Sequence, residues 1–358
     1  MLSILDRYII RKFLSTFFFM LGIIMLLAMV FDISEKLSEF ISNKAPLSAI
    51  LIDYYLNFLL FYGNMFSSMI IFISVIWFTA KLAQDTEIVP MLFSGKPITR
   101  FLRPYIIGAT ILMIISLILN HFIVPRANKV RLDFEEKYYR DVMLVEDYHA
   151  EYPGNQLVYF SNYSNSEDQV HDLTIQTWND SNQPVSFLKA RLAKNYPRTN
   201  KWQLVDYYEK KLDFPKGIIE QGAKKDTVFQ FKIDEMAQRE NVAESMTFKE
   251  LREMIKREKQ KGSANIPFYE IELHQRTSYP FAAYILTIIG VSVSSQKKRG
   301  GIGMNIAIGL GFVFVYIFAM KMMTVASLNV GFPALIAVWI PNFIFSIVAY
   351  FLYRFAQK

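Results

Sequence analysis

Uncharged apolar blocks alternate with polar stretches along this chain of 358 residues. The first block, Phe13–Phe31, contains no charged side chain. At about 1.5 Å per residue it is long enough to cross the hydrocarbon core of a bilayer. Arg7, Arg11 and Lys12 before it would also suit a signal peptide, but the block exceeds an apolar signal core and no small-residue cleavage site follows. We therefore expect a retained membrane span.

Five further blocks have the composition of membrane spans, and the fourth block of the chain is short unless its helix begins earlier at a tilt. The five lie within Leu56–Ala80, within Tyr105–Val124, at Tyr279 to about Ser294, at Ile302 to about Met323 and at Phe332–Tyr353. Together with the first block they predict six transmembrane helices.

The polar interval between the third and fourth blocks contains short runs of β-branched and aromatic residues, separated by turn-forming clusters. This pattern predicts antiparallel strands in a sandwich or jelly roll. The expected strands are residues 156–163, 172–178, 184–194, 201–212 and 226–233. Residues 244–262 then predict a helix that Ser245 caps and Gly262 ends.

The predicted fold is a six-helix membrane protein with an all-β, jellyroll-like domain inserted between helices three and four. We expect an N-terminal transmembrane half at residues 1–124 and the β-domain at residues 125–244. A helix and connector should follow at residues 245–278, and the C-terminal transmembrane half at residues 279–358.

The net charge of +7 is confined to the membrane-embedded parts, because residues 124–280 contain 24 basic and 25 acidic residues. This distribution does not suit a nucleic-acid partner. Among the short loops, one side holds only Lys36 and Lys44, while the other holds Arg7, Arg11, Lys12, Lys81, Lys96, Arg100, Arg103, Lys297, Lys298, Arg299, Arg354 and Lys358. The excess places both termini and residues 84–97 in the cytoplasm and the β-domain outside it.

Residues that carry bond chemistry are scarce. The chain has no cysteine and four histidines, and it lacks HExxH, GxSxG and a complete phosphate-binding loop. Glu270, Glu272, His274 and Arg276 lie together before the fourth span, as a metal site or, in the reading we favour, as interfacial anchors. We therefore expect no catalytic residue, no metal and no cofactor bound by this chain, so another chain must supply any energy.

The stretch Gln84–Pro97, "QDTEIVPMLFSGKP", is more than a turn between spans two and three requires. Asp85 and Glu87 suit the N-terminus of a short helix, Gly95 suits its end, and Pro90 would break it. The apolar middle fits either a groove on another protein or the lipid surface.

Several segments resemble the LptF/LptG lipopolysaccharide-export permeases, in order along nearly the whole chain. They are "ILDRYIIRKFL" before span one, "DTEIVPMLFSGKPITRFLRP" between spans two and three, "IVPRAN" after span three, "ELHQRTSYPFA" at span four and "AVWIPNFIF" in span six. The "LDRYI" opening leans toward the LptG member.

The resemblance implies a permease half of an ABC exporter in the bacterial inner membrane, and not an enzyme. Its partners would be a second permease subunit, a cytoplasmic ATPase dimer that holds ATP and Mg, a periplasmic bridge protein and lipopolysaccharide. Spans one and five would form lateral gates. The resemblance places the ATPase-coupling residues at Asp85, Thr86, Glu87, Ile88, Met91, Leu92, Ser94 and Gly95.

The chain departs from the family at the outer end of span one, where basic residues often hold lipid phosphates. Here "FDISEKLSEF" has three acids around Lys36. We expect Lys36, Lys44 and Lys321 to bind substrate, although the ammonium of Lys321 can instead snorkel to the headgroups.

Two other functions remain open. One is the permease half of another ABC system, which moves lipoprotein or peptide. The other is a periplasmic scaffold that the spans only anchor, although one span would suffice for that. Copurifying chains and lipids distinguish the three.

Overall fold

The structure is a computed structural model that describes residues 3–87, 98–139, 144–152, 154–164, 169–179, 181, 183–196, 201–212, 217–229, 240–260, 263, 265–295 and 301–356. The chain forms two compact units. The first contains Met1–Tyr139, Ala243–Arg252 and Pro267–Lys358, and the second contains Arg140–Val242 and Glu253–Ile266.

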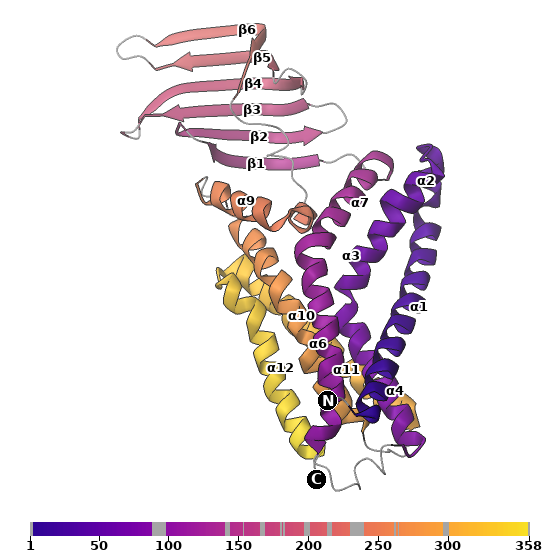
Figure 1. The fold of residues 1–358 in the computed structure, drawn as a ribbon. Helices are drawn as coiled ribbons and strands as arrows, with labels where there is room; N and C mark the ends of the chain where they lie inside the picture. The colour runs from indigo at the N-terminus through magenta and orange to yellow at the C-terminus, as the bar shows by residue number, and fades with distance from the viewer. Residues whose placement is uncertain are drawn as a thin grey trace. The chain divides into compact units, whose positions relative to one another are not determined.

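Long helices make up most of the first unit (Figure 1). They are α1 (Ile4–Ser42), α2 (Leu47–Ala49), the π-helical η1 (Ile50–Leu56), α3 (Asn57–Met65), α4 (Ser67–Gln84), α6 (Ile98–Ile118), the π-helical η2 (Leu119–Ile123), α7 (Val124–Tyr138), α10 (Ile266–Ser294), α11 (Gly301–Val330) and α12 (Ala334–Ala356). Within the described residues, six helical stretches are long and apolar enough to cross a membrane. The prediction of six spans is confirmed.

Several spans are longer than their apolar blocks, and the third and fourth change the predicted boundaries. The third continues through η2 and α7 to Tyr138, so the expected domain boundary after residue 124 falls inside a continuous helix. Although α7 is polar overall, it is amphipathic and buries Leu132 and Phe134. The fourth apolar block is short, but the helix that contains it begins at Ile266, well before Tyr279.

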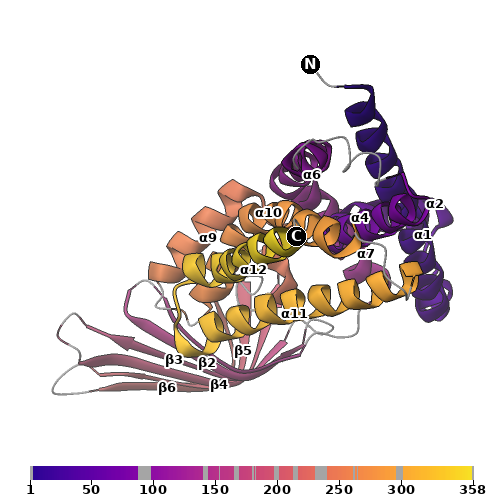
Figure 2. The same cartoon turned by 90° about the horizontal axis from the view of Figure 1, so that it is seen from below.

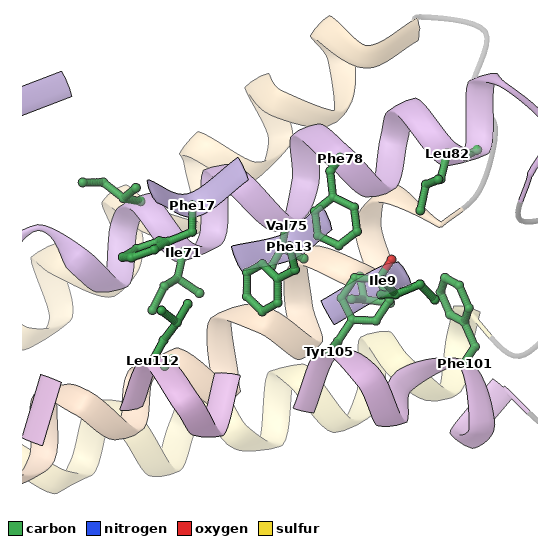
Figure 3. Packing of buried hydrophobic residues seen from close by; sticks show 14 residues of the cluster. Ile9, Phe13, Phe17, Ile71, Val75, Phe78, Leu82, Phe101, Tyr105 and Leu112 are labelled. Atoms are coloured by element: carbon green, nitrogen blue, oxygen red, sulfur yellow. The ribbon is translucent and has the colours of Figure 1, made fainter. Parts of the chain in front are cut away.

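An aromatic cluster holds the beginning of α1 against α4 and α6 (Figure 3). The ring of Phe13 stacks on Phe78 of α4 at 5.7 Å between centroids, and Phe78 stacks on Tyr105 of α6 at 5.2 Å. The hydroxyl groups of Thr79 and Tyr105 share a buried hydrogen bond of 3.0 Å. All three helices are therefore joined by side chains that are almost completely buried.

A second cluster holds the other end of α1. Phe40 packs edge-on against Tyr54 and Phe134 at 5.6 and 5.5 Å between ring centroids. Between the two clusters α1 is mostly exposed, with Phe19, Leu26 and Phe31 among its outward-facing side chains. The helix is thus fixed at both ends and largely uncovered in its middle.

The C-terminal helices form a bundle of their own with α4. Figure 2 shows α10, α11 and α12 grouped beside α4, and their buried side chains form one apolar cluster. Tyr316 of α11 donates a hydrogen bond to Asn342 of α12 (2.7 Å), which in turn donates to the carbonyl of Ser278 on α10 (3.0 Å). Polar contacts therefore fix the register of helices whose contacts are otherwise apolar.

The described strands of the second unit form one antiparallel sheet in sequence order (Figure 1). They are β1 (Leu144–Tyr152), β2 (Gln156–Ser164), β3 (Gln169–Trp178), β4 (Pro184–Tyr196), β5 (Lys201–Lys211) and β6 (Ile218–Thr227). One face buries a core around Phe160, Leu173 and Trp202. The predicted all-β insertion between helices three and four is confirmed.

Two strands differ from the sequence prediction. The last of the five predicted strands was expected at residues 226–233, but β6 ends at Thr227, and Val228 and Phe229 are not in a strand. The remaining residues of that prediction lie outside the described ones. β6 is exposed along nearly all its length and charged, so it lacks the alternation that marks a half-buried strand. β1 was not predicted.

The helix expected at residues 244–262 is α9 (Phe248–Gln260), and its cap differs from the prediction. Ser245 belongs to a preceding 3₁₀ helix, η3 (Glu240–Ser245). Thr247 caps α9 instead: its N–H donates to the Glu250 carboxylate (2.7 Å) and its hydroxyl accepts from the Glu250 N–H (3.4 Å). These bonds lower the pKa of Glu250. They form a capping box, which satisfies two backbone donors.

Gly108 on α6 is predicted to be required for the packing of α1. A Cβ atom there would lie closer than 3.0 Å to two ring carbons of Phe13, which is fully buried between Phe78 and Tyr105. Gly108→Ala should therefore destabilise the protein by about 1–3 kcal/mol, the usual cost of overpacking a core. The midpoint of thermal unfolding in detergent measures this.

Gly311→Ala is the matched control, because nothing lies within 4 Å of the Cβ position there. Alanine is favoured over glycine inside a helix, so this variant should be neutral or slightly stabilised. Equal midpoints for the two variants would contradict the proposed role of Gly108.

Candidate functional site

The expected coupling segment is described only at its beginning. Asp85, Thr86 and Glu87 follow α4, whereas Ile88, Met91, Leu92, Ser94 and Gly95 lie outside the described residues. The short helix expected there therefore stays a prediction. The structure shows the residues that follow α4 and the residues at the beginning of α6.

The chain leaves α4 through a Schellman motif. The N–H of Glu87 donates to the carbonyl of Leu82 (2.9 Å), and the N–H of Thr86 donates to that of Ala83 (3.3 Å). Thr86 has φ 58°, in the left-handed region where glycine is usual. A β-branched residue is strained there, and because Thr86 is exposed the two backbone hydrogen bonds must hold it.

Glu87 is held by α1. Its carboxylate accepts a hydrogen bond from the Tyr8 hydroxyl (3.1 Å), and that hydroxyl accepts one from the Lys12 ammonium (2.7 Å). All three groups are at least partly exposed, so the carboxylate retains free acceptor positions toward solvent or a partner. The acid to which the family resemblance assigns a coupling role is thus attached to the first helix.

Arg100, at the beginning of α6, is held by the same part of α1. Its guanidinium donates to both carboxylate oxygens of Asp6, each at 2.8 Å, and to the Ser3 hydroxyl at 3.2 Å. Asp6 also accepts from the Ser3 N–H (2.9 Å), which closes the capping box of α1. Sequence analysis did not single out Asp6 or Tyr8, although Ser3-x-x-Asp6 is a visible capping signature.

The three lysines expected to bind substrate have different surroundings. Lys36 forms an ion pair with Asp32 (2.8 Å), contacts the Tyr54 hydroxyl and is 12% exposed, so its charge is already neutralised. Lys44 is exposed and occupies the left-handed position (φ 52°) that ends α1. Lys321 is exposed on α11 and forms no ion pair with any residue of the described part.

Lys321 lines a cavity of about 140 Å³ within the first unit. Most of the cavity surface is apolar, with Leu286, Val313 and Met320 among its lining residues. Its polar lining includes Asn64, Ser116 and Asn120, which bond to one another: Ser116 donates to Asn64 (2.9 Å) and Asn64 donates to Asn120 (2.6 Å). Ser67, Ser68, Tyr279 and Tyr316 add further hydroxyl-bearing side chains to the lining. The cavity therefore combines an apolar wall with one cation and an amide network.

Arg276 is the buried member of the charged group before span four. It is 4% exposed, and it donates to Glu272 (2.8 Å) and to the carbonyls of Met246 (2.8 Å) and Ala243 (3.0 Å). No group of side chains that could hold a metal occurs among the described residues. Arg276 thus anchors η3 and the residue after it to α10, which is a contact within the protein and not one at the membrane interface.

Glu244, in η3, has a pKa raised to about 7. Burial is the main cause and the nearby charge of Glu272 adds to it, while Arg131, Lys321 and Arg276 act in the opposite direction. Sequence analysis missed this residue, because its charge balance depends on groups from three separate helices. A pKa of about 7 means that the carboxyl group is partly protonated near neutral pH.

Glu244 is predicted to make the stability depend on pH. Its pKa is raised from 4.5 to about 7 on folding, so the folded state binds more protons between these values and stability falls as pH rises through them. Glu244→Gln should therefore stabilise the protein by up to about 3 kcal/mol at pH 8 and by little at pH 5. Unfolding midpoints at the two pH values measure this.

Glu250→Gln provides a control of opposite sign, since folding lowers the pKa of Glu250. That variant should lose the same stability at pH 5 and at pH 8, because the Glu250 carboxylate is ionised at both pH values whether or not the chain is folded. An equal gain for Glu244→Gln at both pH values would mean that its carboxylate is not protonated near neutrality.

Comparison with known protein families identifies the family to which this sequence is similar. The family model described as lipopolysaccharide export system permease LptF/LptG matches residues 7–355, nearly the whole chain. A search of individual curated proteins gave no match. The matched range contains all six membrane-spanning helices, the inserted sheet and the α4–α6 connection. The chain therefore belongs to the LptF/LptG family of lipopolysaccharide export permeases.

Proposed function

We propose that this chain is one permease half of an ABC exporter that moves lipopolysaccharide out of the inner membrane and passes it to a periplasmic bridge. The observation that carries this proposal is the family match over residues 7–355 on a chain with six apolar helices. A second permease subunit, a paralogue or a copy, would complete the pathway. A cytoplasmic ATPase dimer would bind ATP and Mg and supply the energy. Within the family, the "LDRYI" opening favours the LptG member.

The orientation follows from the basic residues of the short loops. Twelve lysines and arginines on one side against two on the other place both termini and residues 84–97 in the cytoplasm. The inserted sheet is then periplasmic. In this orientation Glu87 faces the compartment that contains the ATPase, which agrees with a coupling role for residues 84–97.

Purification from native membrane tests the proposal. Mass spectrometry should identify an ATPase chain, a permease chain and lipopolysaccharide in the complex. An ATPase without glycolipid would favour an exporter of lipoprotein or peptide, and the absence of any ATPase would favour a membrane-anchored scaffold. Both results would contradict the proposed function.

Glu87 is predicted to couple ATP hydrolysis to export. Glu87→Ala removes the carboxylate at the beginning of the connection while leaving the backbone bonds of the Schellman motif in place. The variant should lower glycolipid release per ATP hydrolysed by about tenfold, as expected for the loss of a charge-assisted contact of about 1.5 kcal/mol. Release and hydrolysis are measured together in proteoliposomes.

Glu35→Ala, at an exposed acid on the same side of the membrane as Lys36 and Lys44, is the matched control and should retain normal coupling. Normal association with the ATPase together with normal release in Glu87→Ala would refute the role assigned to Glu87.

Lys321 is predicted to contact a phosphate group of the lipid. A cation without an ion-pair partner in the described part, at the edge of an apolar cavity, matches an amphiphile with an anionic head. Lys321→Met should reduce crosslinking of lipopolysaccharide to the cavity by about tenfold, whereas Lys321→Arg, which keeps the charge, should retain most of it. Unchanged crosslinking and export in Lys321→Met would leave snorkelling as the explanation of this lysine.

A further inference from the structure

The first two turns of α1 contact both chain segments that flank the α4–α6 connection. Tyr8 holds Glu87 on one flank, and Asp6 holds Arg100 on the other. Asp6 and Arg100 are 94 residues apart in sequence, and Tyr8 and Glu87 are 79 residues apart. These residues are too far apart in sequence to meet through a local turn. Both contacts form because α1, α4 and α6 pack together in the folded chain.

The contact between Asp6 and Arg100 is built to be rigid. Asp6 is 2% exposed, and its two oxygens receive two parallel guanidinium bonds of 2.8 Å. Bidentate, charge-assisted pairs of this kind fix orientation as well as distance. Because one of those oxygens also closes the capping box of α1, the arginine cannot shift without disturbing the beginning of the helix.

The packing next to these contacts continues the attachment. Ile9, Phe13 and Phe17 follow on the same face of α1 and lie in the cluster shared with α4 and α6 (Figure 3). Beyond Phe17 most side chains of α1 turn outward until Phe40. The N-terminal part of α1 is therefore joined to α4 and α6. The middle exposes one side and keeps protein contacts on the other, where Met25 is buried and Asp32 accepts hydrogen bonds from Tyr54 and Tyr55 (3.1 Å each).

We propose that Asp6, Tyr8 and Arg100 are positioning residues that transmit displacement of the α4–α6 connection to α1. This proposal rests on the proposed function, in which the ATPase moves that connection. A displacement at the α6 flank pulls on the beginning of α1 through the bidentate Asp6–Arg100 pair, and one at the α4 flank acts through the single Tyr8–Glu87 hydrogen bond. The exposed middle of α1 then changes its tilt, because its far end is held at Phe40.

This proposal makes a different prediction from a mechanism in which α1 moves only in response to lipid. If the clamp formed by Asp6, Tyr8 and Arg100 is intact, the beginning of α1 keeps its distance from α4 in every state of the nucleotide cycle. If the clamp is broken, α4 moves and α1 follows late or incompletely. Hydrolysis then continues while the pathway for glycolipid no longer opens in step.

The test uses the complete exporter, labelled with two spin probes, at the exposed Ile4 of α1 and the exposed Lys81 of α4. In the unaltered complex the distance should be the same, with a narrow distribution, in the apo, ATP-bound and vanadate-trapped states. Asp6→Asn keeps an oxygen for the capping box but removes the charge. It should broaden this distribution and lower glycolipid release per ATP by about tenfold.

Graded variants separate the clamp from a general loss of folding. Asp6→Glu keeps a carboxylate at the capping position and should restore most of the coupling. Arg100→Lys keeps the charge without the bidentate geometry and should give an intermediate loss. Tyr8→Phe removes only the hydroxyl that Glu87 contacts and should give a smaller loss. Arg103→Gln, an exposed arginine one turn away on α6, is the control and should behave as the unaltered protein.

Two results would overturn the proposal. One is normal release per ATP in Asp6→Asn. The other is lost release with an unchanged distribution of distances between α1 and α4. A complex that hydrolyses ATP but releases no glycolipid even without substitutions would contradict the proposed function instead. In that case the distance measurement still decides whether the clamp holds α1 to α4.

Discussion

Helices inside a hydrocarbon layer gain little by burying leucine against leucine, because lipid tails are as apolar as the side chains they replace. Close fit and polar bonds must therefore decide which helices associate. In this chain the joint between α1, α4 and α6 shows both. Phe13 lies against the bare backbone of Gly108, between two further rings, and the Thr79–Tyr105 hydrogen bond lies within the same cluster. The position of α1, and with it the clamp at Asp6, depends on this fit.

The same principle explains where the polar residues of the spans are found. Asn64, Ser116 and Asn120 bond to one another, Asn342 joins Tyr316 to the backbone of α10, and Arg276 binds two carbonyls of the polypeptide that precedes α9. A buried polar group is costly without a partner and specific with one. These groups therefore fix register at points where apolar contacts alone would allow helices to slide.

The sequence predicted the six spans because an uncharged apolar block as long as Phe13–Phe31 is typical of a transmembrane helix. It placed the start of α10 too late, because Arg276 and Glu272 look like loop residues until their ion pair is seen. It missed β6 for a different reason: an exposed edge strand has no buried face to impose alternation. The links from Asp6 to Arg100 and from Tyr8 to Glu87 join residues far apart in sequence, and composition has no information on such pairs. The sequence therefore indicated which elements form, and it did not indicate the contacts that join α1 to the residues on either side of the α4–α6 connection.

Threonine at position 86 has a mechanical consequence. A glycine in the same left-handed turn could pass to other conformations at little cost, and the end of α4 would then behave as a compliant hinge. A β-branched residue has a narrow basin there, and two backbone bonds keep Thr86 in it. The turn at the end of α4 is therefore stiff, so under the proposed function a displacement received beyond Glu87 would move the helix as a whole instead of only bending the turn.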